Sequence, residues 1–411
     1  MNKGKPLLRG LSNEVRQYMV ITGNYWAFTL TDGALRMLVI LHFHNLGYSP
    51  LQLAMLFLFY EVFGVITNLF GGWFGAHFGL NKTMNIGLLM QVFALSMLLV
   101  PSGYLTVPWV MVAQALSGIA KDLNKMSAKS AIKLLVPADA QNKLYRWVAI
   151  LTGSKNTLKG VGFFLGGLLL TLMGFQGAIL VMAIGLFLVW LLSIFKLKAD
   201  LGKAKNKPKF SQLFSKSPAI NYLSAARLFL FGSRDVWFVV ALPVYLVSSF
   251  NWTHTSVGSF LALWIIGYGF VQAIAPKITG RQNGKLPDGK MVSGWALLLA
   301  IIPGLIATGL MLDFSPQIIL LIGLMLFGIV FAVNSSLHSF LIVHYATDDG
   351  VSLDVGFYYM ANAIGRLVGT VLSGWLYQIA GLEACLWVST VFIAIAALLS
   401  ISLPKQQCNV G

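Results

Sequence analysis

Charged residues are scarce in this chain. Only 10% of its 411 residues are charged and 57% are hydrophobic, and the mean hydropathy is +0.77. Soluble domains carry roughly 25% charged residues, and a soluble helical protein shows polar stripes at helical period. Runs such as 84–100 and 177–195 contain no charged residue at all. Most of this surface therefore cannot face water, which excludes the soluble classes.

Cysteine is also scarce, and several chemical motifs are missing. The two cysteines, Cys385 and Cys408, exclude a disulfide framework and a soft-metal site, so we expect no metal and no cofactor. There is no G-x-x-x-x-G-K-Ser/Thr sequence, which excludes a P-loop and internal ATP hydrolysis. No nucleophile clusters with a base, so we do not expect an enzyme. The first apolar run is too long for a cleavable signal peptide and predicts a transmembrane helix.

The chain is instead rich in long apolar runs. About 20 residues wound as a helix at 1.5 Å per residue match the roughly 30 Å hydrocarbon core of a bilayer. The predicted helices lie at 19–45, 51–76, 83–101, 106–127, 146–172, 177–195, 218–248, 254–276, 291–311, 317–345, 353–377 and 382–403. The sequence thus predicts an all-α membrane protein with twelve transmembrane helices.

Basic residues outnumber acidic ones, 29 Lys and Arg against 13 Asp and Glu, for a net charge of +16. In a soluble protein this excess would suggest nucleic acid. Here the six loops assigned to the outside contain no Lys or Arg, whereas the alternate loops are basic, except 347–350, which is acidic. By the positive-inside rule, both termini are predicted to be cytoplasmic. We expect a multi-pass protein of a bacterial inner membrane, surrounded by lipid and without a nucleic acid partner.

A basic segment at 196–217 holds seven lysines and follows the sixth predicted helix. It predicts a cytoplasmic linker between an N-terminal six-helix bundle, 1–195, and a C-terminal one, 218–411. This arrangement resembles that of major facilitator carriers, whose halves are parallel repeats. The predicted fold is therefore the major facilitator fold, with two pseudo-symmetric six-helix bundles. An offset of 203 residues, which aligns Asp32 with Asp235, supports the repeat.

Two glycine-rich segments resemble major facilitator motifs. Residues 72–82 resemble the cytoplasmic signature G-x-L-A-D-R-x-G-R-K, whose glycines let the second and eleventh helices approach closely. Ala76 replaces the acid of the signature and His77 the next basic residue, so the charge-relay gating assigned to it is not expected here. Residues 162–167 resemble the antiporter motif G-P-x-x-G-G, with Phe163 in place of proline. For both clusters, ordinary tight helix packing is the alternative.

Polar segments inside three predicted helices carry a narrower resemblance. Residues 25–36, 120–129 and 151–160 resemble the organoarsenical efflux permeases (the ArsJ family). The resemblance implies export of 1-arseno-3-phosphoglycerate, which glyceraldehyde-3-phosphate dehydrogenase forms when it uses arsenate in place of phosphate. It also implies arsenate resistance, with that dehydrogenase as the functional partner. The alternative is an importer or exchanger of organophosphates or other organic anions with the same fold.

Ionisable residues inside the predicted helices mark the candidate site. Each costs at least about 2.5–3.5 kcal/mol near the bilayer centre, so its default interpretation is functional. The predicted substrate-binding residues are Arg36, Lys121, Lys155, Lys159, Arg234 and Arg366. The candidates for coupling or gating are Asp32, Glu61 and Asp235, for which structural ion pairing is the alternative. For Lys125, Lys129 and Arg227, the competing interpretation is a structural ion bridge or snorkelling to the inner interface. The histidines are left unassigned.

The balance of these charges favours an anionic solute. Six cations face four carboxylates at comparable depth, and an unpaired surplus in a low-dielectric site is tolerable if an anion fills it. Arg36 and Arg234, on the first and seventh helices, are expected to hold a phosphate or arsenate group with their guanidinium forks. A polyanion that leaves an inside-negative cell gains about 2.3 kcal/mol per charge per 100 mV. Uniport and ion coupling both stay open, and we expect a monomer.

Overall fold

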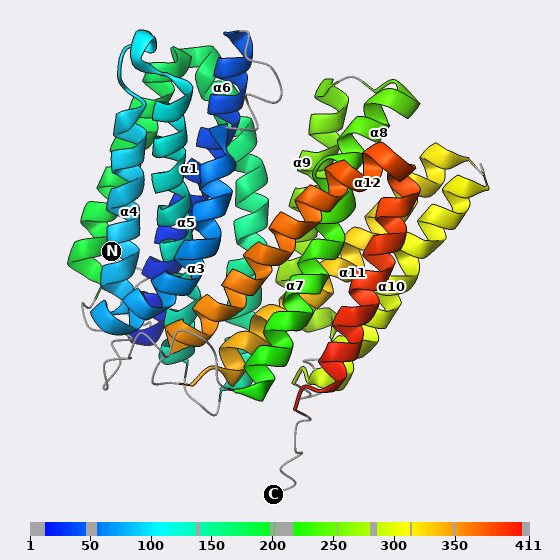
Figure 1. Ribbon diagram of the computed structural model, residues 1–411. Helices are drawn as coiled ribbons and strands as arrows, with labels where there is room; N and C mark the ends of the chain where they lie inside the picture. The colour runs from blue at the N-terminus through cyan, green and yellow to red at the C-terminus, as the bar shows by residue number, and fades with distance from the viewer. Residues whose placement is uncertain are drawn as a thin grey trace, which may run out of the picture.

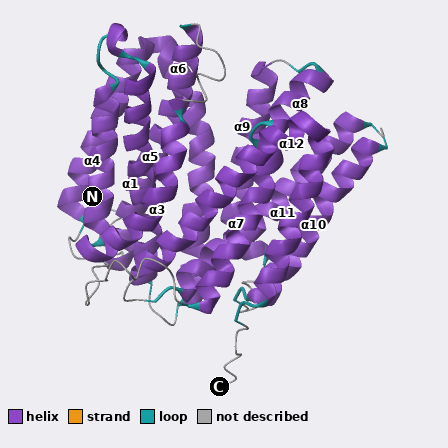
Figure 2. Cartoon of the chain, viewed as in Figure 1, coloured by secondary structure: helices purple, strands orange, loops and turns teal. Residues whose placement is uncertain are grey.

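The computed structural model describes residues 13–46, 56–136, 140–197, 201, 217–252, 254–279, 286–312, 315–347 and 351–404. These residues are almost entirely helical, and no strand is found among them (Figure 2). Figure 1 shows α1, α3, α4, α5 and α6 gathered on one side, and α7 to α12 on the other. The two groups meet at the end where α1 begins and α12 ends.

The helices are α1 (Asn13–Asn45), α3 (Leu58–Phe78), α4 (Leu80–Met97), α5 (Val107–Leu135), α6 (Gln141–Lys196), α7 (Pro218–Phe238), α8 (Ala241–Phe250), α9 (His254–Ile278), α10 (Gly289–Met311), α11 (Pro316–Tyr345) and α12 (Val351–Ile401), with a 3-10 turn, η1, at Ser102–Tyr104. Gly174 and Gly381 divide α6 and α12 into two helices each. Since α7 and α8 form one interrupted helix, the described residues make twelve helical segments. The predicted fold is confirmed.

Several predicted boundaries were wrong. The fourth helix was expected to end at 127, but α5 continues to Leu135, so Lys129 and Lys133 lie in a helix and not in a loop. The seventh helix is broken between α7 and α8, since Pro243 cannot donate a backbone hydrogen bond to the carbonyl of Val239, four residues earlier.

Two outer loops were expected at 172–176 and 378–381, but the helices reverse at single glycines. Gly174 has a φ of 68° and Gly381 a φ of 76°. Other residues are strained in this left-handed region, whereas glycine is not. Most of the predicted linker, residues 198–200 and 202–216, lies outside the described residues, so the domain boundaries stay predictions.

The outer surface suits a lipid environment. Six helical stretches are long and apolar enough by themselves to cross a membrane, and they include both arms of α6 and of α12. Large apolar side chains such as Phe164, Leu172 and Phe195 are exposed on the outside. A soluble monomer rarely exposes apolar patches of this extent.

Glycines reveal the internal repeat. In α6, a Cβ atom at Gly162 would lie 2.6 Å from the carbonyl oxygen of Leu30 in α1. In α12, a Cβ atom at Gly369 would lie 2.6 Å from the carbonyl oxygen of Gly232 in α7. The offset of 203 residues that aligns Asp32 with Asp235 also relates Gly153, Gly162 and Gly166 to Gly356, Gly365 and Gly369. The same helix pair therefore packs in the same way in each half.

Two further glycine contacts join the halves. A Cβ atom at Gly153 of α6 would lie 2.5 Å from the carbonyl oxygen of Gly269 in α9. A Cβ atom at Gly356 of α12 would lie 3.0 Å from the Cα atom of Gly72 in α3. The prediction that glycines of the 72–82 segment let the second and eleventh helices approach closely is confirmed.

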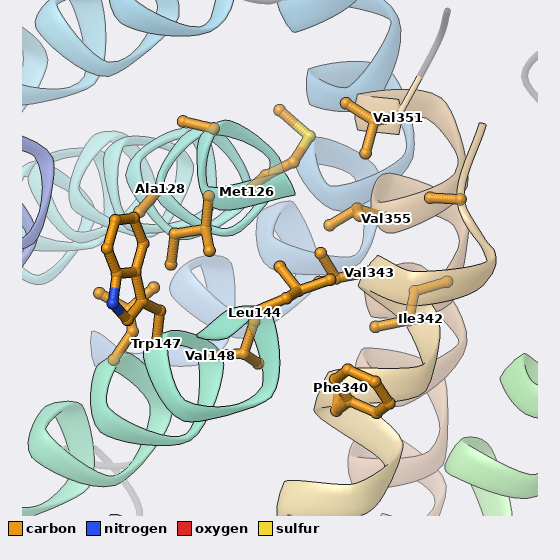
Figure 3. Packing of buried hydrophobic residues seen from close by; sticks show 14 of the residues in the cluster. Met126, Ala128, Leu144, Trp147, Val148, Phe340, Ile342, Val343, Val351 and Val355 are labelled. Carbon is orange, nitrogen blue, oxygen red and sulfur yellow. The ribbon is translucent and has the colours of Figure 1, made fainter. Parts of the chain in front are cut away.

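One hydrophobic cluster connects the halves at the end where α1 begins and α12 ends. We call it the inter-half seal; its members include Tyr25, Met126, Leu144, Val148, Phe340, Val343, Val351, Val355 and Tyr358. Figure 3 shows Leu144 of α6 beside Val343 of α11. Fully burying such a side chain stabilises by about 1.5–3 kcal/mol relative to exposing it. This end is therefore held closed by apolar packing.

The opposite end is built differently. One cluster there contains only residues of the first half, such as Leu38, Leu98 and Ile179. A second cluster contains only residues of the second half, such as Leu246 and Leu310. The halves thus share buried apolar packing at one end and pack separately at the other.

The contact between α1 and α6 leads to the first testable expectation. Gly166→Ala should lower the melting temperature, because the new methyl group meets the backbone of Ala34, and such overpacking costs about 1–3 kcal/mol. Gly167→Ala, one residue along, is the matched control, since its methyl group would lie 3.7 Å from Leu41. Thermal unfolding of both variants in detergent measures the difference. Equal melting temperatures would contradict the close packing.

Candidate functional site

Charged side chains from both halves gather in the middle of the bundle. The carboxylate of Glu61 in α3 lies within electrostatic range of Arg36, Lys121 and Lys159 from the first half. It also lies within range of Arg366, on α12 in the second half. The structure therefore brings four of the predicted substrate-binding residues around one carboxylate.

An ion pair connects α1 to α3. Nη2 of Arg36 lies 3.2 Å from Oε1 of Glu61, and the guanidinium stacks 4.8 Å from the ring centroid of Tyr60. The Tyr60 hydroxyl donates a 2.8 Å hydrogen bond to Asp32. Arg36 thus pairs with Glu61, while Asp32 bonds to Tyr60. The side chains of Arg36 and Glu61 keep 23% and 39% of their surface exposed, so this pair stays accessible.

A second carboxylate links α7 to α12. Asp235 is fully buried and accepts a 2.6 Å hydrogen bond from Nε of Arg234, whose Nη2 lies 2.5 Å away. It also accepts a 2.9 Å hydrogen bond from Nε of Arg366. Asp235 thus forms the ion pairs that were the alternative to coupling, and its part in transport stays a prediction. The side chain of Arg366 is one-third exposed, so a solute can contact it while it remains paired with Asp235.

The lysines of α5 form a stripe along one face. Lys121 lies 3.9 Å from Oδ2 of Asp122 and 3.8 Å from the ring centroid of Tyr60. Lys125 donates a 2.5 Å hydrogen bond to Oδ1 of the same carboxylate. Asp122 is therefore shared by two of the stripe's cations.

Two buried cations lie nearer the inter-half seal. Lys129 donates hydrogen bonds of 2.9 Å to Thr152 of α6 and 3.5 Å to Ser339 of α11. Arg227 donates a 2.9 Å hydrogen bond to Asn362 and lies 3.7 Å above the ring of Phe231. The snorkelling interpretation was wrong for Lys129 and Arg227, because each side chain turns into the protein and not toward the interface.

The lysines of α6 differ from the other cations. Among the described residues, Lys155 and Lys159 have no ion pair and no hydrogen bond. The strongest electrostatic neighbours of Lys155 are cations: Lys125, Lys159, Lys121 and Arg366. Lys159 lies within range of Asp32, whose carboxylate bonds to Tyr60. The positive surplus is therefore concentrated on one face of α6.

The cations also follow an order along the bundle axis. At 1.5 Å per residue, Lys129 lies roughly 9 Å from the end of α5 at the inter-half seal, Lys125 roughly 15 Å and Lys121 roughly 21 Å. Counted from the start of α6 at the same end, Lys155 lies roughly 21 Å and Lys159 roughly 27 Å away. We call this series the cation ladder.

His338 is one of the histidines that the sequence left unassigned. It lies inside α11 with a fully buried side chain. The run of polar residues at 334–339 within an otherwise apolar helix is the signal that marks it. Lys133 and His344, at the ends of α5 and α11, are joined by a 3.1 Å bond from the lysine to the backbone oxygen.

Comparisons with known proteins agree with this architecture. The family model of the Major Facilitator Superfamily matches residues 21–287 and 223–407. The human organic anion transporter TETRAN is 16% identical, with a TM-score of 0.76 over 95% of this chain and 100% of that chain. The E. coli fucose:proton symporter FucP is 12% identical, with a TM-score of 0.73 over 96% and 100%.

A bacterial homologue of the iron transporter ferroportin, solved in an outward-facing state, is 14% identical. Its TM-score is 0.75 over 95% of this chain and 99% of that chain. At identities this low, the likeness concerns the fold. Among curated protein sequences, none matches this chain significantly.

Proposed function

This chain belongs to the Major Facilitator Superfamily and is a secondary membrane transporter, and we propose that it exports the anionic organoarsenical 1-arseno-3-phosphoglycerate. The resemblance of 25–36, 120–129 and 151–160 to the organoarsenical efflux permeases supports this solute. These three segments contribute Asp32, Arg36, three lysines of α5 and both lysines of α6 to the charged centre. The segments that carry the resemblance thus also carry most of the site.

One observation carries the proposal: neither Lys155 nor Lys159 forms an ion pair among the described residues, and the strongest electrostatic neighbours of Lys155 are cations. An uncompensated charge in a membrane interior is costly. An anion that binds between these lysines removes that cost. A pentavalent arsenic ester is a hard oxyanion like phosphate, which ammonium and guanidinium groups suit and thiolates do not.

The ion pairs determine which of the expected ligands are free to bind the solute first. Arg36 and Arg234 are already paired with carboxylates, so the two arginine forks are not free to hold the solute first. We place Lys155 and Lys159 at the centre of the site, with Lys121 beside them. Arg36 and Arg366, which are partly exposed, then exchange a carboxylate contact for the solute. Glu61 neutralises these cations when no solute is bound.

The inter-half seal supports a transport cycle by alternating access. With both termini in the cytoplasm, the sealed end is the cytoplasmic one, and the described conformation faces outward. The bacterial ferroportin homologue of similar fold was also solved in an outward-facing state. Rocking of the two halves about the charged centre then moves the solute across the bacterial inner membrane.

The membrane potential is a sufficient driving force. A solute with about three negative charges gains about 7 kcal/mol when it leaves across 100 mV, at about 2.3 kcal/mol per charge. We therefore propose uniport by a monomer. Ion coupling through Glu61, the most exposed of the three candidate carboxylates, is the alternative.

Growth of an arsenic-sensitive bacterial host tests the function. We expect arsenate resistance only when this chain and glyceraldehyde-3-phosphate dehydrogenase are expressed together, because the dehydrogenase makes the solute and the chain removes it. Arsenite resistance is not expected, since trivalent arsenic prefers thiolates. Of the two cysteines, Cys385 is buried and Cys408 lies outside the described residues.

Arsenite resistance from the chain alone would overturn the proposal. The organophosphate alternative predicts a different result in the same strains. Resistance to neither arsenical, together with restored growth on a phosphorylated carbon source, would identify an organophosphate carrier.

A further inference from the structure

Two cations lie buried between the halves, close to the inter-half seal. Lys129 is 2% exposed and comes from α5 of the first half; Arg227 is 3% exposed and comes from α7 of the second half. Both reach the same helix, α11, where Arg227 donates to Ser335 at 3.3 Å and Lys129 donates to Ser339 at 3.5 Å. Since these serines are four residues apart, about 6 Å along the helix axis, the two cations contact neighbouring turns of α11.

In the described part of the chain, no carboxylate forms an ion pair with Lys129 or Arg227. Their other partners are the neutral Thr152 and Asn362 and the rings of Tyr359 and Phe231. The charged neighbours within electrostatic range of Lys129 are Arg227, Lys155 and Lys125, all of them cations. An anion bound between two buried cations would relieve their repulsion.

His338 adds an unused donor at the same place. It lies three residues after Ser335 on the same face of α11, is fully buried, and is within electrostatic range of Arg227. Neither ring nitrogen has a hydrogen-bond partner among the described residues. A buried polar group normally has one, so this imidazole is available to a ligand.

We propose that Lys129, Arg227 and His338 form a second anion site, which binds one phosphate-type oxyanion group between the halves. The inference rests on the proposed anionic solute, but it assigns a separate position, near the cytoplasmic end of the cation ladder. An anion held there bridges the first half to the second through two charge-assisted contacts. It is the first position that a solute from the cytoplasm meets, before Lys155 and Lys159 take it over.

Thermal unfolding of the purified full-length protein tests this site, with inorganic phosphate and 3-phosphoglycerate as probes at constant ionic strength. Phosphate should raise the melting temperature of the native protein. In Lys129→Met and in Arg227→Met, the apparent phosphate affinity should fall about 10- to 100-fold, the effect of losing one charge-assisted hydrogen bond. Because Lys155 and Lys159 can bind phosphate as well, both methionine variants are also compared in the Lys155→Gln, Lys159→Gln background, where the remaining response reports this site alone. The response should persist in Lys82→Met, which removes an exposed lysine of α4.

A second readout separates binding from structural damage. Without phosphate, Lys129→Met should melt at a higher temperature than the native protein, because it removes like-charge repulsion. Lys129→Arg should keep the phosphate response. An unchanged response in both methionine variants would overturn the proposal, as would a response lost only with Lys155 and Lys159. If only 3-phosphoglycerate raises the melting temperature, the ligand of this site is the phosphorylated solute. If phosphate raises it, the ligand is the free ion.

These results are independent of the arsenate growth test. If the protein shows the phosphate response but confers no arsenate resistance, the second anion site is supported and the organoarsenical proposal is contradicted. If it confers resistance but shows no phosphate response, only the second anion site is contradicted.

Discussion

Replacing Lys155 and Lys159 together by glutamine should abolish solute export and leave the protein folded. Each lysine contributes a charge-assisted contact of about 1.5–3 kcal/mol to an anion, so losing both should lower the transport rate at least about 100-fold. Folding should not suffer, because neither ammonium group has a hydrogen bond or an ion pair among the described residues. Uptake of the organoarsenical into everted membrane vesicles measures the rate, and thermal unfolding measures the stability.

Lys82→Gln is the control for this variant, since it removes a lysine from the exposed start of α4 without touching the charged centre. Transport within about threefold of the native rate in the double variant would show that the lysines of α6 are not ligands. A large fall in melting temperature would show instead that they have structural partners.

Asp235→Asn should have the largest effect on stability. Asp235 is fully buried and is the only carboxylate of the described residues that forms an ion pair with Arg234 or Arg366, so the substitution leaves Arg234 without an ion pair and Arg366 with only the more distant Glu61. Breaking a buried ion pair by removing one partner costs about 3–5 kcal/mol. We expect a strong fall in the yield of folded protein and in its melting temperature, measured in detergent.

Glu61→Gln is the matched control, because it also removes one carboxylate from an arginine. Its ion pair with Arg36 is 39% exposed on the glutamate side, and exposed pairs contribute about 0–1 kcal/mol. If Asp235→Asn had the same melting temperature as the native protein but no transport activity, Asp235 would act in coupling and not in stability.

The architecture was predictable because it depends on local composition. Runs of about 20 apolar residues define most of the helices by themselves, and the charge of the loops distinguishes the two ends. The break between α7 and α8 was predictable in principle from Pro243, whose ring removes the bond to Val239. Gly174 and Gly381 look like parts of short loops in the sequence, since only their backbone angles reveal that single residues reverse the chain.

The partners of the charged residues were not predictable from spacing alone. Asp32 and Arg36 share a helix face, yet Asp32 bonds to Tyr60 and Arg36 to Glu61. These contacts depend on how α1 packs against α3. Lys129 looked interfacial because its helix was expected to end at 127, and two further turns place it in the interior.

The inter-half seal also has a kinetic consequence. The orientation that buries more apolar surface is the more populated one in an empty carrier. The described residues of the two halves share apolar packing only at the end where α1 begins and α12 ends. The empty protein is therefore mostly closed at that end. At any moment only a small fraction of carriers is open on that side, and the apparent affinity for solute from that side is weaker than the intrinsic affinity by that fraction.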